Sequence, residues 1–261
     1  MKRLCAVLLM LVVWPAWADF QDGLDAYNRG DYANALKEWR PLAEQGDAAA
    51  QASLGVMYDN GYGVLQDHAQ AAKWYRLAAE QGLAGAQISL GLMYYDGIGV
   101  PQDHAQAVKW YRLAAEQGLA DAQASLGLMY DNGIGVPQDH AQAAKWYRLA
   151  AEQGLAGAQI SLGLMYYDGI GVPQDHAQAV KWYRLAAEQG LADAQFNLGI
   201  RYYNGQGVPQ DYVQAHLWWN LAAAQGDEEA RENRDIIAAK MTPAQIEEAQ
   251  RLAREWLAAH P

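Results

Sequence analysis

The sequence has very little cysteine, few basic residues and almost no phenylalanine. Its 261 residues include a single cysteine, Cys5, so the chain can form no disulfide within itself and packing alone must hold it together. Lys and Arg number 19 against 30 Asp and Glu, a formal net charge of -11, which argues against a nucleic-acid-binding protein. Two Phe stand beside 10 Trp and 16 Tyr, an imbalance that indicates a repeated unit.

The first eighteen residues predict a secretory signal peptide. Lys2 and Arg3 precede an apolar run over 4–13, and the small residues Ala16 and Ala18 mark a cleavage site after position 18. The apolar run is shorter than the ~20 residues of a membrane-spanning helix. We therefore expect an exported protein comprising residues 19–261, periplasmic or secreted further, with no membrane insertion after cleavage.

A 36-residue period organises the remaining sequence. The string Ala-Ala-Glu-Gln-Gly, or Ala-Ala-Ala-Gln-Gly in the last copy, recurs at this period and ends at Gly82, Gly118, Gly154, Gly190 and Gly226. Five repeats are predicted, over 47–82, 83–118, 119–154, 155–190 and 191–226. A capping helix pair is expected over 19–46 and capping helices over 227–261. Residues 83–118 and 155–190 are identical, so the duplicated module is a pair of repeats, 72 residues long.

Each repeat predicts two helices. In the second repeat, Ala86, Leu90 and Met93 form the apolar stripe of a first helix that ends at Gly97. Gly91 lies inside this helix, and its recurrence predicts a close contact that tolerates no side chain. The loop that follows, GIGVPQ, contains a proline that cannot continue a helix.

Asp103 is predicted to begin the second helix of this repeat. A capping box with Gln106 is expected there, as is a Schellman cap at Gly118. The buried face of this helix is expected to carry Ala107, Trp110, Tyr111 and Ala114. Arg112 and Glu116 are expected to form a solvated surface pair.

Two short antiparallel helices cannot bury their apolar faces alone. Each repeat must therefore stack on the next, which predicts an all-α fold, a right-handed α-solenoid of stacked antiparallel helix pairs. The two ends are expected to be covered by the aromatic residues of 19–46 and by a group of apolar residues near the C-terminus. The members of these two groups are Tyr27, Tyr32, Leu36 and Trp39, and Ile236, Ile237, Ile246, Leu252 and Trp256.

The strings LGLMYYDGIGVPQD and A-x-x-K-W-Y-R-L-A-A-E-Q-G resemble the Sel1-like repeat, a relative of the tetratricopeptide repeat. The resemblance covers nearly all of the chain after the predicted signal peptide. It implies a protein-recognition module without catalytic activity, and bacterial members of the family include envelope scaffolds, signalling regulators and secreted host-interaction factors. It also implies that the pair over 19–46 is a tetratricopeptide-like cap.

Catalytic, metal and cofactor sites find no support in the motifs. His68, His104, His140 and His176 recur at one position, but equivalent residues of stacked helices lie ~8 to 10 Å apart, so no metal ion could bridge them. We expect them to be solvated residues of a first helical turn. The Ser-x-x-Lys and Lys-Thr-Gly motifs of β-lactamases, which some family members are said to resemble, are absent, so an enzyme of this kind remains only a remote alternative. No cofactor and no metal are expected.

The outer face of the first helices is the candidate binding surface. In tetratricopeptide-like solenoids this face lines a concave groove, and here its residues alternate between apolar or aromatic and acidic steps. The predicted partner-binding residues are Asp59, Ile88, Tyr95, Asp131, Ile160, Tyr167, Phe196 and Tyr203. We expect a monomer that binds an extended peptide or helix of a partner protein. Packing of this stripe between neighbouring helices, and a glycan-binding role for its tyrosines, are the alternatives.

Overall fold

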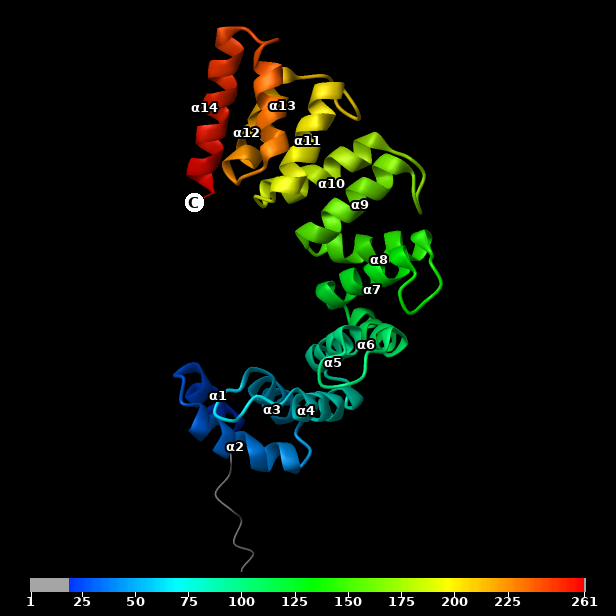
Figure 1. The fold of residues 1–261 in the computed structure, drawn as a ribbon, viewed down its shortest axis with the longest axis vertical. Helices are drawn as coiled ribbons and strands as arrows, with labels where there is room; N and C mark the ends of the chain where they lie inside the picture. The colour runs from blue at the N-terminus through cyan, green and yellow to red at the C-terminus, as the bar shows by residue number, and fades with distance from the viewer. Residues whose placement is uncertain (1–18, 261) are drawn as a thin grey trace, which may run out of the picture. The chain divides into compact units, whose positions relative to one another are not determined.

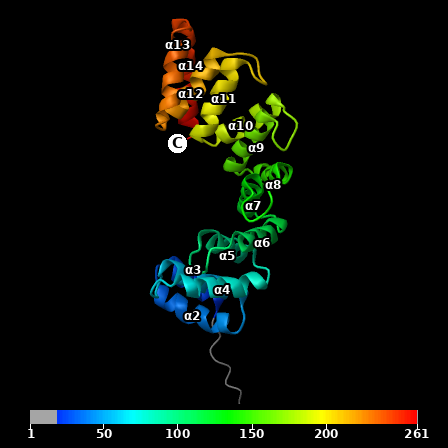
Figure 2. The same ribbon diagram turned by 45° about the vertical axis from the view of Figure 1, so that its right-hand side comes forward.

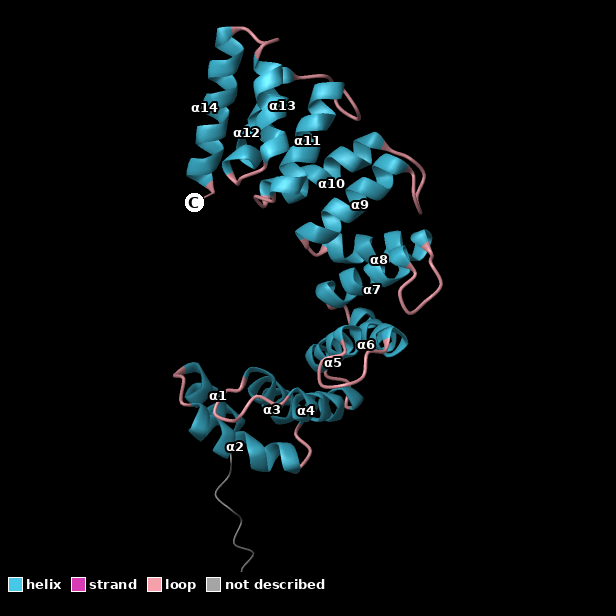
Figure 3. Ribbon diagram, in the orientation of Figure 1, coloured by secondary structure: helices cyan, strands magenta, loops and turns pink. Residues whose placement is uncertain are grey.

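The computed structural model describes residues 19–260, which contain fourteen helices and no strand (Figure 3). The chain divides at residues 102 and 103 into two compact units. The predicted signal peptide lies outside the described residues. Among those residues, no helix combines the length and the apolar character needed to cross a membrane.

The helices follow the predicted repeats closely. The first unit contains α1 (Phe20–Asn28), α2 (Tyr32–Glu44), α3 (Ala48–Asn60), α4 (His68–Glu80) and α5 (Ala84–Asp96). The second unit contains α6 (His104–Glu116), α7 (Ala120–Asn132), α8 (His140–Glu152), α9 (Ala156–Asp168), α10 (His176–Glu188), α11 (Ala192–Asn204), α12 (Tyr212–Ala224), α13 (Glu228–Ala238) and α14 (Pro243–Ala259). Two helices per repeat are thus confirmed.

The helix ends form where the sequence predicts them, with one exception. Asp67 begins α4, and its carboxylate accepts a hydrogen bond from the backbone N–H of Gln70 at 3.0 Å. The predicted capping box is wrong, because the glutamine side chain does not return the bond. The backbone N–H of Asp67 is already bound, at 2.8 Å, to the carbonyl of Tyr58 in the preceding helix.

The second helix of each repeat ends in the predicted Schellman cap. In α6, the N–H of Leu119 donates to the carbonyl of Ala114 at 3.3 Å and that of Gly118 to Ala115 at 3.0 Å. Gly118 has a φ of 93°, a conformation that only glycine adopts without strain. The chain therefore reverses direction within two residues of the helix end, which brings the next helix back alongside.

Consecutive helices pack against each other from α1 to α5 in the first unit and from α6 to α13 in the second (Figure 1). Alanines of the second helices lie under large side chains, and the predicted buried residues Trp110 and Tyr111 are buried. The equivalent Tyr75, Tyr147 and Tyr183 are buried as well, so the recurring tyrosines are core residues as predicted, whereas Trp74 and Trp146 are only half-buried. The molecule is an α-solenoid of stacked helix pairs.

Two hydrogen bonds recur between neighbouring repeats and hold their register. Buried Gln123 donates to the carbonyl of Ala115 in the preceding repeat at 3.1 Å. Within its own repeat, Gln123 also accepts from Gln153 at 2.8 Å. Arg112 donates to the hydroxyl of Tyr130 in the next repeat at 2.7 Å. The expectation that Arg112 forms a surface pair with Glu116 is therefore wrong, since the guanidinium is bound across the repeat interface.

Aromatic and apolar residues cover both ends. At the N-terminal end, Trp39 is buried, and Tyr27, Tyr32 and Leu36 pack against the same cluster, as predicted. At the C-terminal end, α12 packs against both α13 and α14 (Figure 2). The apolar residues predicted to cover this end lie in its core clusters, namely Ile237, Ile246, Leu252 and Trp256. Ile236 does not, because 58% of its surface is exposed.

Candidate functional site: two equivalent Asp–His hollows

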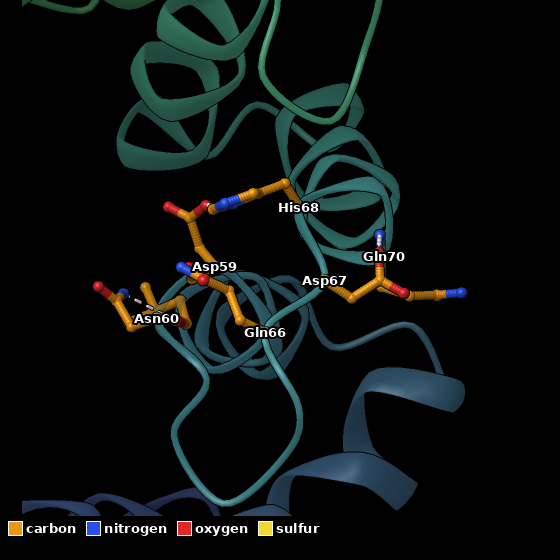
Figure 4. A network of polar contacts seen from close by, with 7 residues as sticks. Asp59, Asn60, Gln66, Asp67, His68 and Gln70 are labelled. Atoms are coloured by element: carbon orange, nitrogen blue, oxygen red, sulfur yellow. Dashed lines mark hydrogen bonds and ion pairs between the residues drawn. The ribbon is translucent and has the colours of Figure 1, made fainter.

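The carboxylate of Asp59 and the imidazole of His68 face each other beside the loop that joins α3 to α4. Asp59 lies in the last turn of α3, His68 is the first residue of α4, and Figure 4 shows their side chains pointing toward each other. His68 Nδ1 lies 2.7 Å from an Asp59 oxygen. Gln66 holds the loop in place by donating to the Asp59 carbonyl at 2.8 Å. The Asp67 cap fixes the start of α4 and thereby the position of the imidazole.

The same pair occurs in the repeat two positions further along. Asp131 and His140 are 2.8 Å apart, and Gln138 donates to the Asp131 carbonyl at 2.8 Å. The expectation that these histidines are merely solvated is wrong at His68 and His140. Each is half-buried and bound to an aspartate that ends the preceding helix.

Each pair lies in a hollow of about 300 Å³. The first hollow has a volume of 320 Å³ and the second 290 Å³, and the two are lined by equivalent residues. The next helix and the loop after it supply a second aspartate, a serine and three apolar side chains to each hollow, the isoleucine coming from the loop. In the first these are Asp96, Ser89, Leu92, Met93 and Ile98, and in the second Asp168, Ser161, Leu164, Met165 and Ile170.

The walls combine negative charge with exposed apolar surface. Leu92 is 52% exposed and Leu164 49% exposed. The serine of each hollow interacts with a buried tyrosine, Tyr75 in one case and Tyr147 in the other. Burial raises the pKa of Tyr147 to about 12, and the Asp131 carboxylate contributes to the rise. Two carboxylates among the lining residues thus give each hollow an acidic rim.

At two of the positions where tyrosine replaces the aspartate, Tyr167 and Tyr203, a basic side chain from the chain lies against the ring. Tyr167 occupies the position of Asp131 one repeat later, and the Arg201 guanidinium carbon lies 3.7 Å from its ring centroid. Arg201 is 5% exposed and stands where the preceding repeat has Met165. Its hydrogen bond and charge lower the pKa of the Tyr167 hydroxyl.

The following repeat shows the same arrangement with a different cation. Tyr203 occupies the equivalent position, and Lys240 Nζ lies 2.8 Å from its hydroxyl oxygen and 5.2 Å from its ring centroid. Tyr203 also stacks on Tyr212 with ring centroids 5.7 Å apart. In two successive repeats, a basic side chain from the segment that follows, Arg201 or Lys240, therefore lies against the tyrosine at this position.

All eight residues predicted to bind a partner are half-buried. The structure brings Asp59 and Asp131 into the two hollows, whereas Ile88 and Tyr95 are not among the hollow-lining residues. The remaining predicted residues, Ile160, Tyr167, Phe196 and Tyr203, pack against core clusters of the second unit. Their use by a partner stays a prediction.

Sequence reasoning missed the histidines, serines and second aspartates of the hollows. The sequence did contain a signal for the histidines, since Asp59 and Asp131 each precede a histidine by nine residues. This separation spans a helix end and a loop, so no helical periodicity relates the two side chains. Across the described residues, no group of three or more His, Cys, Asp and Glu is placed to hold a metal ion.

Comparisons with known proteins agree with the fold. The Sel1 repeat model matches residues 48–83, 84–119, 120–155, 156–191 and 192–227, one residue later than the predicted boundaries. A Sel1 repeat protein from Oxalobacter formigenes is 35% identical with a TM-score of 0.80, over 93% of this chain and 98% of that one. No curated protein matches.

A second solved structure is c5321, described as a protective antigen of uropathogenic Escherichia coli with an SLR fold. It is 40% identical with a TM-score of 0.82, and the match covers 90% of this chain and 52% of that one. The present chain therefore spans about half the length of that protein. With five matched repeats and these two structural relatives, the chain belongs to the Sel1 repeat family.

Proposed function

We propose that this protein is an exported, non-catalytic scaffold of the bacterial cell envelope that binds a partner protein or peptide. Sel1 repeats are typical of protein-interaction scaffolds, and five of them occupy residues 48–227. The observation that carries the proposal is the recurrence of one hollow, with an acidic rim and exposed leucines, in two repeats of the chain. Such a surface suits a segment of partner chain with apolar and basic side chains.

Affinity capture tests the scaffold role. The bait is the chain over residues 19–261, incubated with envelope extract of the source cell, and the control bait is an unrelated helical-repeat protein of similar net charge. We expect one or a few proteins enriched over the control, each of which binds the purified chain in calorimetry. If every enriched protein fails to bind the purified chain, the scaffold proposal is wrong.

The exported location needs its own measurement. Fractionation of the source cell should place the processed chain in the periplasm, whereas recovery from the cytoplasm with residues 1–18 intact would contradict export. A point substitution that abolished nitrocefin turnover by the pure protein would contradict the non-catalytic role.

A secreted, host-facing role is the second candidate function. It is favoured by the 40% identity to a protein described as a protective antigen. Processed chain that accumulates in the culture medium while a periplasmic marker stays in the cell would support it over the envelope scaffold.

A further inference from the structure

Among the described residues, the penultimate residue of the first helix contacts a Lys or Arg side chain in two repeats and forms no ion pair with Lys or Arg in two others. At Tyr167 and Tyr203 the basic group comes from the chain itself, Arg201 in one case and Lys240 in the other. At Asp59 and Asp131 no Lys or Arg of the described residues forms an ion pair with the carboxylate. The position of Arg201 is taken there by Met93 and Met165, which are uncharged.

Arg201 shows that the fold accommodates a guanidinium at the position that Met93 and Met165 occupy beside the two hollows. The central carbon of its guanidinium lies 3.7 Å from the Tyr167 ring centroid, and Arg201 lowers the pKa of the Tyr167 hydroxyl. The side chain is almost entirely buried, yet Nε and Nη1 have no hydrogen-bond partner. A guanidinium is therefore held at this position even by a neutral tyrosine. A carboxylate in the same place offers a stronger acceptor.

We propose that each Asp–His hollow binds an arginine side chain of the partner protein. The inference rests on the proposed scaffold function and names the chemistry that the partner must carry. In the first hollow, Asp59 and Asp96 supply the negative charge that pairs with the guanidinium. In the second, Asp131 and Asp168 do the same.

The histidine orients the acceptor within each hollow. It engages one oxygen of Asp59 at 2.7 Å and is the only side chain in the described part of the protein that hydrogen-bonds this carboxylate. The carboxylate is thus held in one orientation while its other oxygen accepts the guanidinium. His140 holds Asp131 in the same way at 2.8 Å.

The size and the walls of the hollows favour arginine over a larger ligand. Volumes of 320 and 290 Å³ lie at the lower end of the range for ligand sites, roughly 300 to 1,000 Å³, and suit one side chain. Leu92 and Ile98 provide apolar surface for the methylene groups of the arginine. A guanidinium is also less strongly hydrated than an ammonium group, so it loses less on entering a partly apolar site.

Short peptides test the proposal directly. The probe is fluorescein-labelled acetyl-Gly-Ser-Leu-Arg-Leu-Ser-Gly amide, titrated into the chain over residues 19–261 and followed by fluorescence polarisation and calorimetry. We expect two peptides bound per chain. Replacement of the arginine by citrulline, its neutral analogue, should weaken binding by about tenfold or more, because hydrogen bonds between charged partners are lost. Lysine in its place should bind with intermediate strength.

Variants of the hollows identify the site. Asp59→Asn and Asp131→Asn should each reduce the stoichiometry to one peptide, and the double variant should weaken binding about tenfold or more. The matched control is Glu80→Gln with Glu152→Gln, which removes the same charge from exposed positions of the same two repeats. It should leave the affinity within about twofold, since exposed charges away from the site are screened.

A second pair of variants fills the hollows from within. Met93→Arg and Met165→Arg place a guanidinium where the chain already has Arg201, so peptide binding should be lost while circular dichroism shows an intact helical fold. If these variants unfold, the asparagine variants decide the question. Equal binding of the arginine and citrulline peptides, or an unchanged affinity in the double asparagine variant, would overturn the proposal.

The outcome also separates this inference from the scaffold function. A partner captured equally well by the wild-type chain and by the double asparagine variant would leave the scaffold proposal standing and refute the hollows as its arginine sites. Capture that is lost in the double variant but kept in the glutamine control would support both.

Discussion

In four repeats, a glycine inside the first helix lies directly under an aromatic ring of the second helix. A Cβ atom built on Gly127 would lie 2.8 Å from Cδ1 of Tyr147, and one on Gly55 would lie 2.6 Å from the same atom of Tyr75. In the last repeat the ring is Trp219, 2.5 Å from a Cβ on Gly199. Glycine costs about 1 kcal/mol of helix stability relative to alanine, so its recurrence reflects this packing.

Replacing this glycine should therefore destabilise the protein despite the gain in helix propensity. We expect Gly127→Ala to reduce the free energy of unfolding by about 1 to 3 kcal/mol, because the methyl group displaces the Tyr147 ring. Gly157→Ala is the matched control. It lies in α9, where an added methyl group would meet no atom within 4 Å, and should raise stability by up to about 1 kcal/mol. Urea denaturation followed by circular dichroism measures both, and two changes of the same sign would contradict the assignment.

The buried tyrosines should make the protein sensitive to alkaline pH. Burial raises the pKa of both Tyr147 and Tyr183 to about 12 in the folded protein, whereas an unfolded tyrosine titrates near 10.0. The folded state keeps these protons where the unfolded state has lost them. Their contribution to stability is therefore complete below pH about 10 and is lost as the pH rises to about 12.

Urea midpoints measured across this range, with tyrosinate absorbance at 295 nm, test the alkaline prediction. Exposed tyrosines should ionise before the unfolding transition, and the buried ones should ionise together with it. The variants Tyr147→Phe and Tyr183→Phe should show a shallower loss of stability with pH. An unchanged slope in both variants would assign the effect to other groups.

At the scale of the helix, the sequence was sufficient to predict where each helix ends but not which residues form contacts between repeats. Asp67 and Gly118 act on backbone groups within a few residues, so the local sequence is sufficient to place them. The Arg112 bond to Tyr130 depends on how one helix stacks on the next, which no spacing within a helix reveals. The Asp59–His68 pair depends likewise on the path of a loop. The same limitation explains why only the two aspartates of the hollows were predicted.

The aspartates that cap the second helices should contribute measurably to the stability of the protein. The Asp139 carboxylate accepts from the backbone N–H of Gln142 at 3.0 Å, and its removal leaves an amide of the first turn without this partner. We expect Asp139→Ala to lower the free energy of unfolding by about 1 kcal/mol. Asp121→Ala removes the same charge from an exposed position in the first turn of α7 that does not cap the helix through its side chain, and should cost less. Thermal unfolding of the two variants side by side provides the comparison, and an equal loss would show that charge rather than capping is responsible.

At the scale of the whole chain, the repeat sequence allows a unit to be removed without creating a new kind of interface. Residues 83–118 and 155–190 are identical, so α9 has the same sequence as α5. In the native chain α4 packs against α5. Deleting residues 83–154 joins Gly82 to Leu155, and α9 then follows α4 with every residue of the α4 and α5 contact unchanged.

The shortened chain should fold, because stability in a solenoid is approximately a sum of terms for each repeat and for each nearest-neighbour interface. The deletion removes 72 residues, which amount to two repeats with their interfaces, while both capping segments remain. We expect a helical protein that unfolds cooperatively at a lower urea concentration than the full chain. A deletion of residues 83–136 serves as the control. It removes one and a half repeats and joins a second helix to another second helix, so it should lose cooperative unfolding. A 72-residue deletion that also unfolds without cooperativity would mean that the repeats depend on contacts beyond their nearest neighbours.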